Sequence, residues 1–180
     1  ALIGQMKEPL IRRKPKEMDL PPKDWALIGA KGRKPNRLKS LYLQDGELSD
    51  HNWKLHQKYE QMKKEEVRFE SFCVDDAQIV IAAFGSIARV SKTSVELARE
   101  EGMKVGLFRP ITLFPFPEKA LYHLSQQVKL FLTVELNTGQ MVEDVRLSVD
   151  RDAQVYFYGR PPGSLPTPED VLGEIKKYYG

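Results

Sequence analysis

The stretch from Gln78 to Gln140 constrains the fold of this 180-residue chain more than any other part of the sequence. Three short apolar runs in it are typical of strands buried on both faces of a sheet: residues 78–84, 104–108 and 129–135. Two segments with helical spacing of apolar residues separate them: 87–101 and 117–126. Strands that alternate with helices in this way predict a mostly parallel α/β sheet with helices on both faces.

The sequence beyond this stretch adds further elements of the same kind. The alternation of apolar and polar residues at 67–72 predicts a short, half-exposed strand at a sheet edge. Residues 154–158 predict another strand. We expect a solvated amphipathic helix with one packing face from about Ser49 to Glu66, and a shorter helix over 139–149.

The last helix carries the clearest start signal in the chain. Thr167 stands as a cap, Pro168 takes the first helical position, and two acidic residues follow in the first turn. The expected apolar face then runs to the end of the chain through Val171, Leu172 and Ile175.

The first part of the chain has a different character. Residues 1–40 carry eleven Lys/Arg and four Asp/Glu, a net charge of +7, so the remainder carries −4 of the total of +3. Proline, glycine and lysine interrupt any apolar period, which predicts an extended arm. We therefore expect a basic arm over 1–47, a connecting helix over 48–66 and an α/β domain over 67–180.

The basic arm points to an anionic contact rather than to nucleic acid. It has almost no interleaved aromatic residues beyond Trp25, and no nucleic-acid module follows it. The cations around Gly32 are expected either to meet an acidic partner surface or to bind a phosphorylated cofactor such as coenzyme A: Lys31, Arg33, Lys34 and Arg37.

Composition excludes several function classes. No apolar run reaches the roughly 18 residues that a membrane span needs, and no secretory signal is visible, so a cytoplasmic location is expected. One cysteine, Cys73, excludes a disulfide or an iron–sulfur site within the chain, and three histidines make a histidine metal cage a poor fit. No dinucleotide fingerprint or P-loop follows any expected strand, and Gly85-Ser86 fits a plain strand-to-helix turn better than an anion site.

An unusual proline and phenylalanine turn follows the second expected strand. Because proline continues neither a sheet ladder nor a helix, the segment from Arg109 to Pro117 predicts a stiff apolar knob that contains Phe114 and Phe116. These rings either cap the core or form part of an interface or site. Arg109 is then either a salt-bridge partner across an interface or an anion clamp.

Polar residues also follow the third expected strand. Glu135, Asn137 and Gln140 stand where ligands of open α/β sheets gather. A carboxylate at this position is either functional or, as we favour, a structural acceptor for backbone N–H groups of the next loop.

Several of these motifs occur in one order along the chain. They are Leu20–Arg33, Ser40–Leu43, Ile79–Gly85, Arg109–Pro117, Glu135–Met141 and Leu165–Pro168. In this order they resemble the α subunit of 2-oxoacid:ferredoxin oxidoreductases, of the 2-oxoisovalerate or 2-oxoglutarate type. Within that subunit, the chain resembles the transketolase C-terminal-like domain and its connecting arm, and Ala1–Met6 resembles the last strand of the preceding part.

The resemblance implies a three-layer α/β/α sandwich whose five-stranded sheet has one antiparallel edge strand at 67–72. It implies a complex that converts a 2-oxoacid, coenzyme A and oxidised ferredoxin to acyl-CoA, carbon dioxide and reduced ferredoxin. Thiamine diphosphate, Mg²⁺ and iron–sulfur clusters are then expected elsewhere in the complex, with a β subunit, further subunits and ferredoxin as partners. No catalytic residue and no bound cofactor are expected on this piece, which serves assembly and site shaping in a hetero-oligomer.

Two other functions remain open from the sequence. The chain could be a non-catalytic interaction module whose arm docks on an acidic partner. It could also be a stand-alone α/β domain that binds coenzyme A or a nucleotide.

Overall fold

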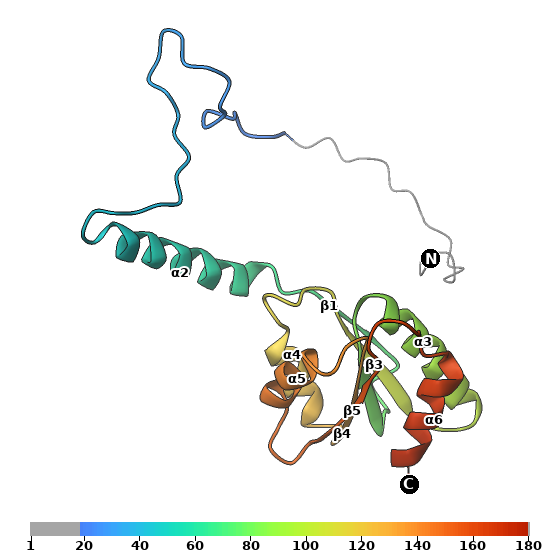
Figure 1. Ribbon diagram of the computed structural model, residues 1–180. Helices are drawn as coiled ribbons and strands as arrows, with labels where there is room; N and C mark the ends of the chain where they lie inside the picture. Colours follow the sequence, from blue (N-terminus) through green and yellow to red (C-terminus); the bar gives the residue numbers. More distant parts are fainter. Residues whose placement is uncertain (1–18, 180) are drawn as a thin grey trace. The chain divides into compact units, whose positions relative to one another are not determined.

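A computed structural model describes residues 19–179 of the chain (Figure 1). The chain divides into two compact units, with the boundary between Lys58 and Tyr59. The expected strand at Ala1–Met6 lies outside the described residues.

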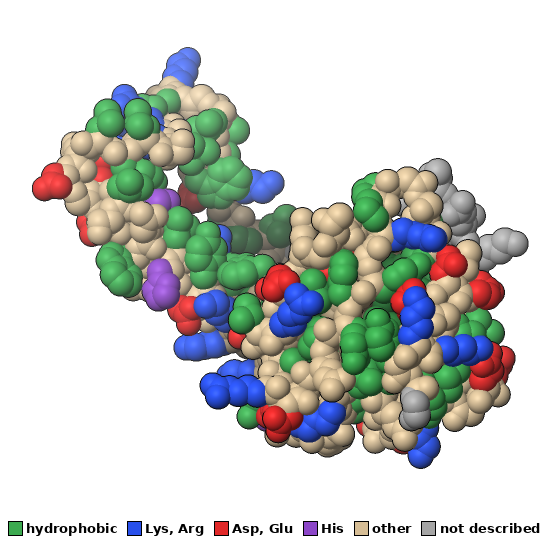
Figure 2. Space-filling view, turned by 60° about the horizontal axis from the view of Figure 1, so that its bottom comes forward, with side chains coloured by type: hydrophobic (Ala, Val, Ile, Leu, Met, Phe, Trp, Pro, Cys, Tyr) green, Lys and Arg blue, Asp and Glu red, His purple; other side chains and the backbone are tan. Residues whose placement is uncertain are grey.

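The first unit is an arm followed by most of a helix. Residues 19–46 form turns and extended segments without helix or strand, and helix α2 then runs over Glu47–Glu65. No residue of α2 is fully buried; on the packing face that the sequence predicts, Leu55 and Met62 are half-buried and Trp53 is exposed. Hydrophobic and basic side chains share the surface of this unit (Figure 2).

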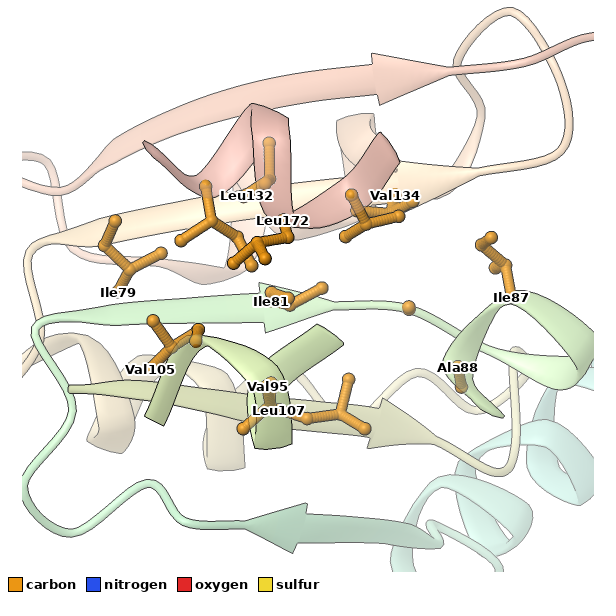
Figure 3. Close-up of a cluster of buried hydrophobic side chains, with 14 of the residues drawn as sticks. Ile79, Ile81, Ile87, Ala88, Val95, Val105, Leu107, Leu132, Val134 and Leu172 are labelled. Carbon is orange, nitrogen blue, oxygen red and sulfur yellow. The ribbon is translucent and has the colours of Figure 1, made fainter. Parts of the chain in front are cut away.

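The second unit is built on a five-stranded sheet in the order β1-β3-β2-β4-β5. The strands are β1 Phe69–Phe72, β2 Ile79–Ala82, β3 Val105–Pro110, β4 Leu130–Glu135 and β5 Gln154–Gly159. All neighbouring pairs are parallel except β1 with β3, and Figure 3 shows the arrow of β1 opposed to the other four. The predicted fold class, with its antiparallel edge strand, is confirmed.

Helices cover both faces of the sheet and make three layers (Figure 1). One face carries α3 Gly85–Glu100 and α6 Pro168–Tyr178, which pack against each other. The other face carries α4 Glu118–Ser125 and α5 Met141–Ser148.

The pleat of β2 explains its uninterrupted apolar sequence. Ile79 and Ile81 pack into the cluster under α3 and α6, whereas Val80 and Ala82 pack into the cluster under α4 and α5. Successive side chains of a strand point to opposite faces, so a central strand that is covered twice needs apolar residues at every position. Figure 3 shows the α3 and α6 side of this core.

The expected turn after β3 begins later than the sequence predicts. Pro110 is the last residue of β3 and pairs with Phe69 of β1, so the expectation that Arg109 and Pro110 already belong to the turn is wrong. A proline is tolerated there because the ladder needs no N–H from it: the next donor, the Ile111 N–H, bonds to the Arg68 carbonyl at 2.9 Å.

No helix among the described residues has the length and apolar character that crossing a membrane requires.

Candidate functional site

The carboxyl end of β4 holds a fully buried carboxylate. Glu135 is 0% exposed, and both its oxygens accept hydrogen bonds from the first turn of α5. Oε2 accepts from the Met141 N–H and Oε1 from the Val142 N–H, each at 2.9 Å. The first N–H groups of a helix lack partners within the helix and favour a negative charge, so Glu135 fixes the start of α5.

The loop between β4 and α5 is organised by the same carboxylate. The Asn137 Nδ2 donates to Glu135 Oε2 at 3.0 Å, and the Asn137 Oδ1 accepts from the Gly139 N–H at 2.7 Å. Gly139 has a φ of +112°, a conformation that a side chain would strain. The Gln140 side chain is exposed, while its N–H lies 3.3 Å from Glu135 Oε1. The structure therefore brings Glu135, Asn137 and Gln140 together around backbone N–H groups.

Arg109 belongs to a different neighbourhood. It lies on β3 opposite Glu70 of β1, and its Nη1 bonds to Glu70 Oε2 at 2.8 Å. Strand β2 lies between β3 and β4, so Arg109 and Glu135 stand two strand spacings apart, roughly 10 Å. The Arg109 Nε is buried and has no hydrogen-bond partner among the described residues.

The two phenylalanines of the turn after β3 have different environments. Phe114 is 55% exposed and meets Tyr59 edge to face at 5.7 Å between ring centroids. Phe116 is half-buried and packs on the cluster under α4 and α5. One ring therefore completes the core, and the other faces solvent.

A groove of about 1100 Å³ lies beside this turn. Apolar residues of its lining include Phe69, Leu113, Phe114, Phe116 and Leu124, and charged residues include Lys63, Lys64, Glu118, Lys119 and Asp144. An apolar patch bounded by charges of both signs has the composition of a protein-binding surface.

Two groups of the groove have raised pKa values. Burial raises the pKa of the Asp144 carboxyl, and the negative charges of Glu118, Glu135 and Glu143 raise it further. The hydrogen bond from Lys63 to Glu60, at 2.9 Å, raises the pKa of the Lys63 ammonium. Sequence reasoning missed Asp144, because only the fold brings these four carboxylates near one another.

The cations of the arm lie in the first unit. The Arg33 guanidinium donates to the carbonyls of Gly29 and of Lys34. Lys31, Lys34 and Arg37 are exposed, and their side chains have no partner within residues 19–179.

The remaining candidates from the sequence are the Gly85-Ser86 turn and the histidines. The first turn of α3, at Gly85-Ser86, has no side-chain cap and no acidic residue. His51 bonds to the Tyr42 hydroxyl at 3.1 Å. Within residues 19–179, no cluster of three or more His, Cys, Asp or Glu side chains is arranged to hold a metal ion.

The chain is similar to subunits of 2-oxoacid oxidoreductases along its whole length. It is 41% identical to the ketoisovalerate oxidoreductase subunit VorB of Methanothermobacter thermautotrophicus over 183 aligned residues, which cover 100% of this chain and 51% of VorB. It is 32% identical to the 2-oxoglutarate synthase subunit KorA of Methanothermobacter marburgensis over 56% of this chain and 27% of KorA. The chain thus spans about half the length of VorB.

Solved structures support the fold. A 2-oxoglutarate:ferredoxin oxidoreductase from Magnetococcus marinus, solved with 2-oxoglutarate, coenzyme A and succinyl-CoA bound, matches with a TM-score of 0.66 and 20% identity over 77% of this chain and 24% of that one. A split gene transketolase matches with a TM-score of 0.51 and 15% identity over 61% of this chain and 40% of that one.

A family match covers most of the α/β unit. The family described as pyruvate:ferredoxin oxidoreductase core domain II matches residues 77–171, which is more than half of the chain and runs from the start of β2 into α6. With this match, the chain belongs to the pyruvate:ferredoxin oxidoreductase core domain II family, and its resemblance to 2-oxoacid:ferredoxin oxidoreductase subunits is confirmed.

Proposed function

We propose that this chain is the second core domain, with its preceding arm, of the α subunit of a thiamine-diphosphate-dependent 2-oxoacid:ferredoxin oxidoreductase. The observation that carries the proposal is the alignment of the whole chain with VorB at 41% identity. In the proposed complex, a 2-oxoacid is decarboxylated and oxidised with coenzyme A and ferredoxin to acyl-CoA, carbon dioxide and reduced ferredoxin.

The substrate we propose is a branched-chain 2-oxoacid such as 2-oxoisovalerate. The alignment with VorB extends over all of this chain, whereas the alignment with KorA covers 56% of it. The arm and α2 thus take part in the first similarity as well as the α/β unit.

The domain's own role in the proposal is assembly and site shaping. The Glu135 carboxylate at the end of β4 accepts hydrogen bonds from the start of α5, and Arg109 near the end of β3 forms an ion pair with Glu70 of β1. Both side chains therefore stabilise the carboxyl edge of the sheet. The exposed rim of the groove, with Leu113 and Phe114, is the surface that we assign to contact with the rest of the subunit or complex.

The cofactors belong to other parts of the proposed complex. A four-cysteine cluster does not fit a chain whose single cysteine is half-buried Cys73, so the proposal gives these residues no part in electron transfer. Thiamine diphosphate, Mg²⁺ and the clusters are assigned to the remaining half of the subunit and to the β and further subunits. A cytoplasmic hetero-oligomer is the assembly that we propose.

An assay of the native complex tests this function. The natural gene product carrying an affinity tag is purified from its source without oxygen, and reduction of a low-potential viologen dye is followed. We expect reduction that requires both coenzyme A and a 2-oxoacid, fastest with 2-oxoisovalerate. A metal-replete complex that reduces no dye with any 2-oxoacid contradicts the proposal.

A second function rests on the arm. Between Lys31 and Lys39 the chain carries five cations and no acidic residue, and Trp25, Ile28 and Leu43 near this segment are 58–85% exposed. We propose that the arm docks on an acidic protein surface with apolar pockets, such as another part of the complex.

Charge reversal separates this docking role from the fold. The variant with Lys31→Glu, Lys34→Glu and Arg37→Glu is expected to separate from the other subunits of the complex during purification. Added salt is expected to weaken the association of the unmodified chain with these subunits. The matched control, Lys54→Glu with Lys58→Glu on α2, is expected to keep them. Equal loss in both variants contradicts a specific role of the segment from Lys31 to Arg37.

A further inference from the structure

The two edges of the sheet are protected differently. Strand β1 has four residues and carries Glu70, which is paired with Arg109. Strand β5 has six residues, none of them charged and none a proline, and none of them is fully buried. Proteins commonly protect an open strand edge with charges, prolines or a short strand. The edge of β1 follows this rule, and the edge of β5 does not.

The backbone of β5 presents hydrogen-bonding groups at this edge. The Gln154 N–H bonds to the Lys129 carbonyl at 2.8 Å, and the Arg160 N–H bonds to the Glu135 carbonyl at 2.9 Å, so the even-numbered residues face β4. Alternate residues of a strand direct their N–H and C=O groups to opposite edges. Val155, Phe157 and Gly159 therefore direct theirs away from β4, and no described strand pairs with them (Figure 3).

We propose that β5 pairs antiparallel with β5 of a second copy of this chain, about a two-fold axis at Tyr156. With a two-fold axis perpendicular to the sheet, residues whose N–H and C=O groups point away from β4 must lie opposite residues of the same kind in the second copy. With the axis at Tyr156, Val155 opposes Phe157 of the other copy and Ala153 opposes Gly159. An axis at Phe157 would oppose Ala153 to Pro161, which has no N–H to give, so the first register keeps more hydrogen bonds.

Charge complementarity supports a second copy as the occupant. Antiparallel pairing brings the start of one β5 next to the end of the other, and therefore Asp152 near Arg160 of the second copy. The Asp152 carboxylate has no partner among the described residues, whereas the Asp150 carboxylate is already bound by Gln126 at 2.9 Å. Arg160 bonds to Asp170 through Nη1 at 3.1 Å, and no described contact involves its Nη2.

The surface next to this edge is open and partly apolar. A hollow of about 750 Å³ lies at the start of β5, and its lining includes Val155, Asp152 and Leu147. Leu147 on α5 is 86% exposed. A second copy would extend the sheet to a continuous ten strands and cover this apolar surface, since each copy contributes the same five strands.

Cysteine cross-linking of the full chain tests the register. In a Cys73→Ser background, Tyr156→Cys places the two sulfurs at the axis, where directly opposed Cβ atoms lie about 5 Å apart. We expect a disulfide-linked dimer under mild oxidation. The matched control, Gln154→Cys, places its two cysteines four residues out of register, about 13 Å apart, and is expected to stay unlinked.

Sedimentation of the unmodified chain provides a readout that does not depend on these variants. We expect a reversible dimer, which Asp152→Lys weakens about tenfold because the contact with Arg160 occurs twice. A chain that remains monomeric at the highest concentration reached overturns the proposal, including the case in which β5 pairs only with a different subunit. Equal cross-linking of the two cysteine variants, or a dimer that Tyr156→Cys does not link, overturns it as well.

Discussion

At the residue scale, Glu135 has a definite structural role. Its carboxylate is fully buried and bonds to Met141, Val142 and Asn137, so it joins the end of β4 to the start of α5. The sequence interpretation that we favoured, an acceptor for loop N–H groups, agrees with this geometry. What the sequence did not indicate is that the contacts extend to the first helical residues of α5.

Glu135→Gln is expected to destabilise the chain by about 3 kcal/mol. The substitution keeps the shape but removes the charge, and it turns one acceptor oxygen into an NH₂ group that faces backbone N–H groups. Urea unfolding measures the change. Glu143→Gln on the exposed side of α5 is the control. It should cost less than about 0.5 kcal/mol, because Glu143 forms only a surface ion pair with Arg146. Similar costs for both variants would contradict the role assigned to Glu135.

Alanine substitutions at two glycines are expected to change folding stability in opposite directions. A Cβ added at Gly106 in β3 would lie 2.7 Å from the Cys73 carbonyl oxygen and 3.0 Å from the Val74 Cα, and both are backbone atoms. Gly106→Ala is therefore expected to cost about 2 kcal/mol. A Cβ at Gly173 in α6 would meet nothing within 4 Å, so Gly173→Ala is expected to stabilise by about 0.5–1 kcal/mol. Thermal unfolding of the two variants checks both signs, and a neutral Gly106→Ala would refute the close approach.

At the element scale, α6 begins with a complete capping box. The Thr167 Oγ1 accepts from the Asp170 N–H at 3.2 Å, and the Asp170 Oδ2 accepts from the Thr167 N–H at 2.9 Å. This second bond, followed by the charge of Arg160, lowers the pKa of the Asp170 carboxyl.

The capping box makes α6 sensitive to acid. A carboxyl with a lowered pKa in the folded state stabilises that state above the ordinary Asp pKa, and the effect disappears as the pH falls through the lowered value. Asp170→Asn is therefore expected to be less stable than the unmodified chain at neutral pH. The difference should be constant down to about pH 5 and shrink below about pH 4. Unfolding curves at several pH values check this, and a difference independent of pH would contradict it.

The elements that the sequence predicts well are those fixed by local chemistry. The capping order at Thr167 sets the start of α6, and the apolar run of β2 follows from burial on both faces. Features that depend on distant neighbours could not be read in advance. Pro110 stays in β3 because β1 needs no N–H from it, and Phe114 and Phe116 have different environments although only Pro115 lies between them. The pairing of Arg109 with Glu70 likewise depends on a strand register that no local signal sets.

At the scale of the whole molecule, the second unit contains the buried apolar core of the described residues, whereas the first unit contributes exposed surface. Every buried apolar residue of the described chain lies between Ile79 and Ile175. The arm and the first part of α2, up to Lys58, therefore contribute exposed hydrophobic side chains and charge, but no core.

Removal of residues 1–58 is expected to leave a cooperatively folded α/β unit whose melting temperature lies within about 5 °C of the full chain. The reason is that burial of apolar surface supplies most folding free energy, and the truncation removes no described buried residue. Truncation at Leu165 is the control, because it removes all of α6 with its buried residues Val171, Leu172 and Ile175, and it should abolish cooperative unfolding. Melting followed by circular dichroism compares the two. Loss of cooperative unfolding after removal of 1–58 would make the arm part of the fold, whereas its retention leaves the exposed apolar and basic side chains of the arm free to bind a partner.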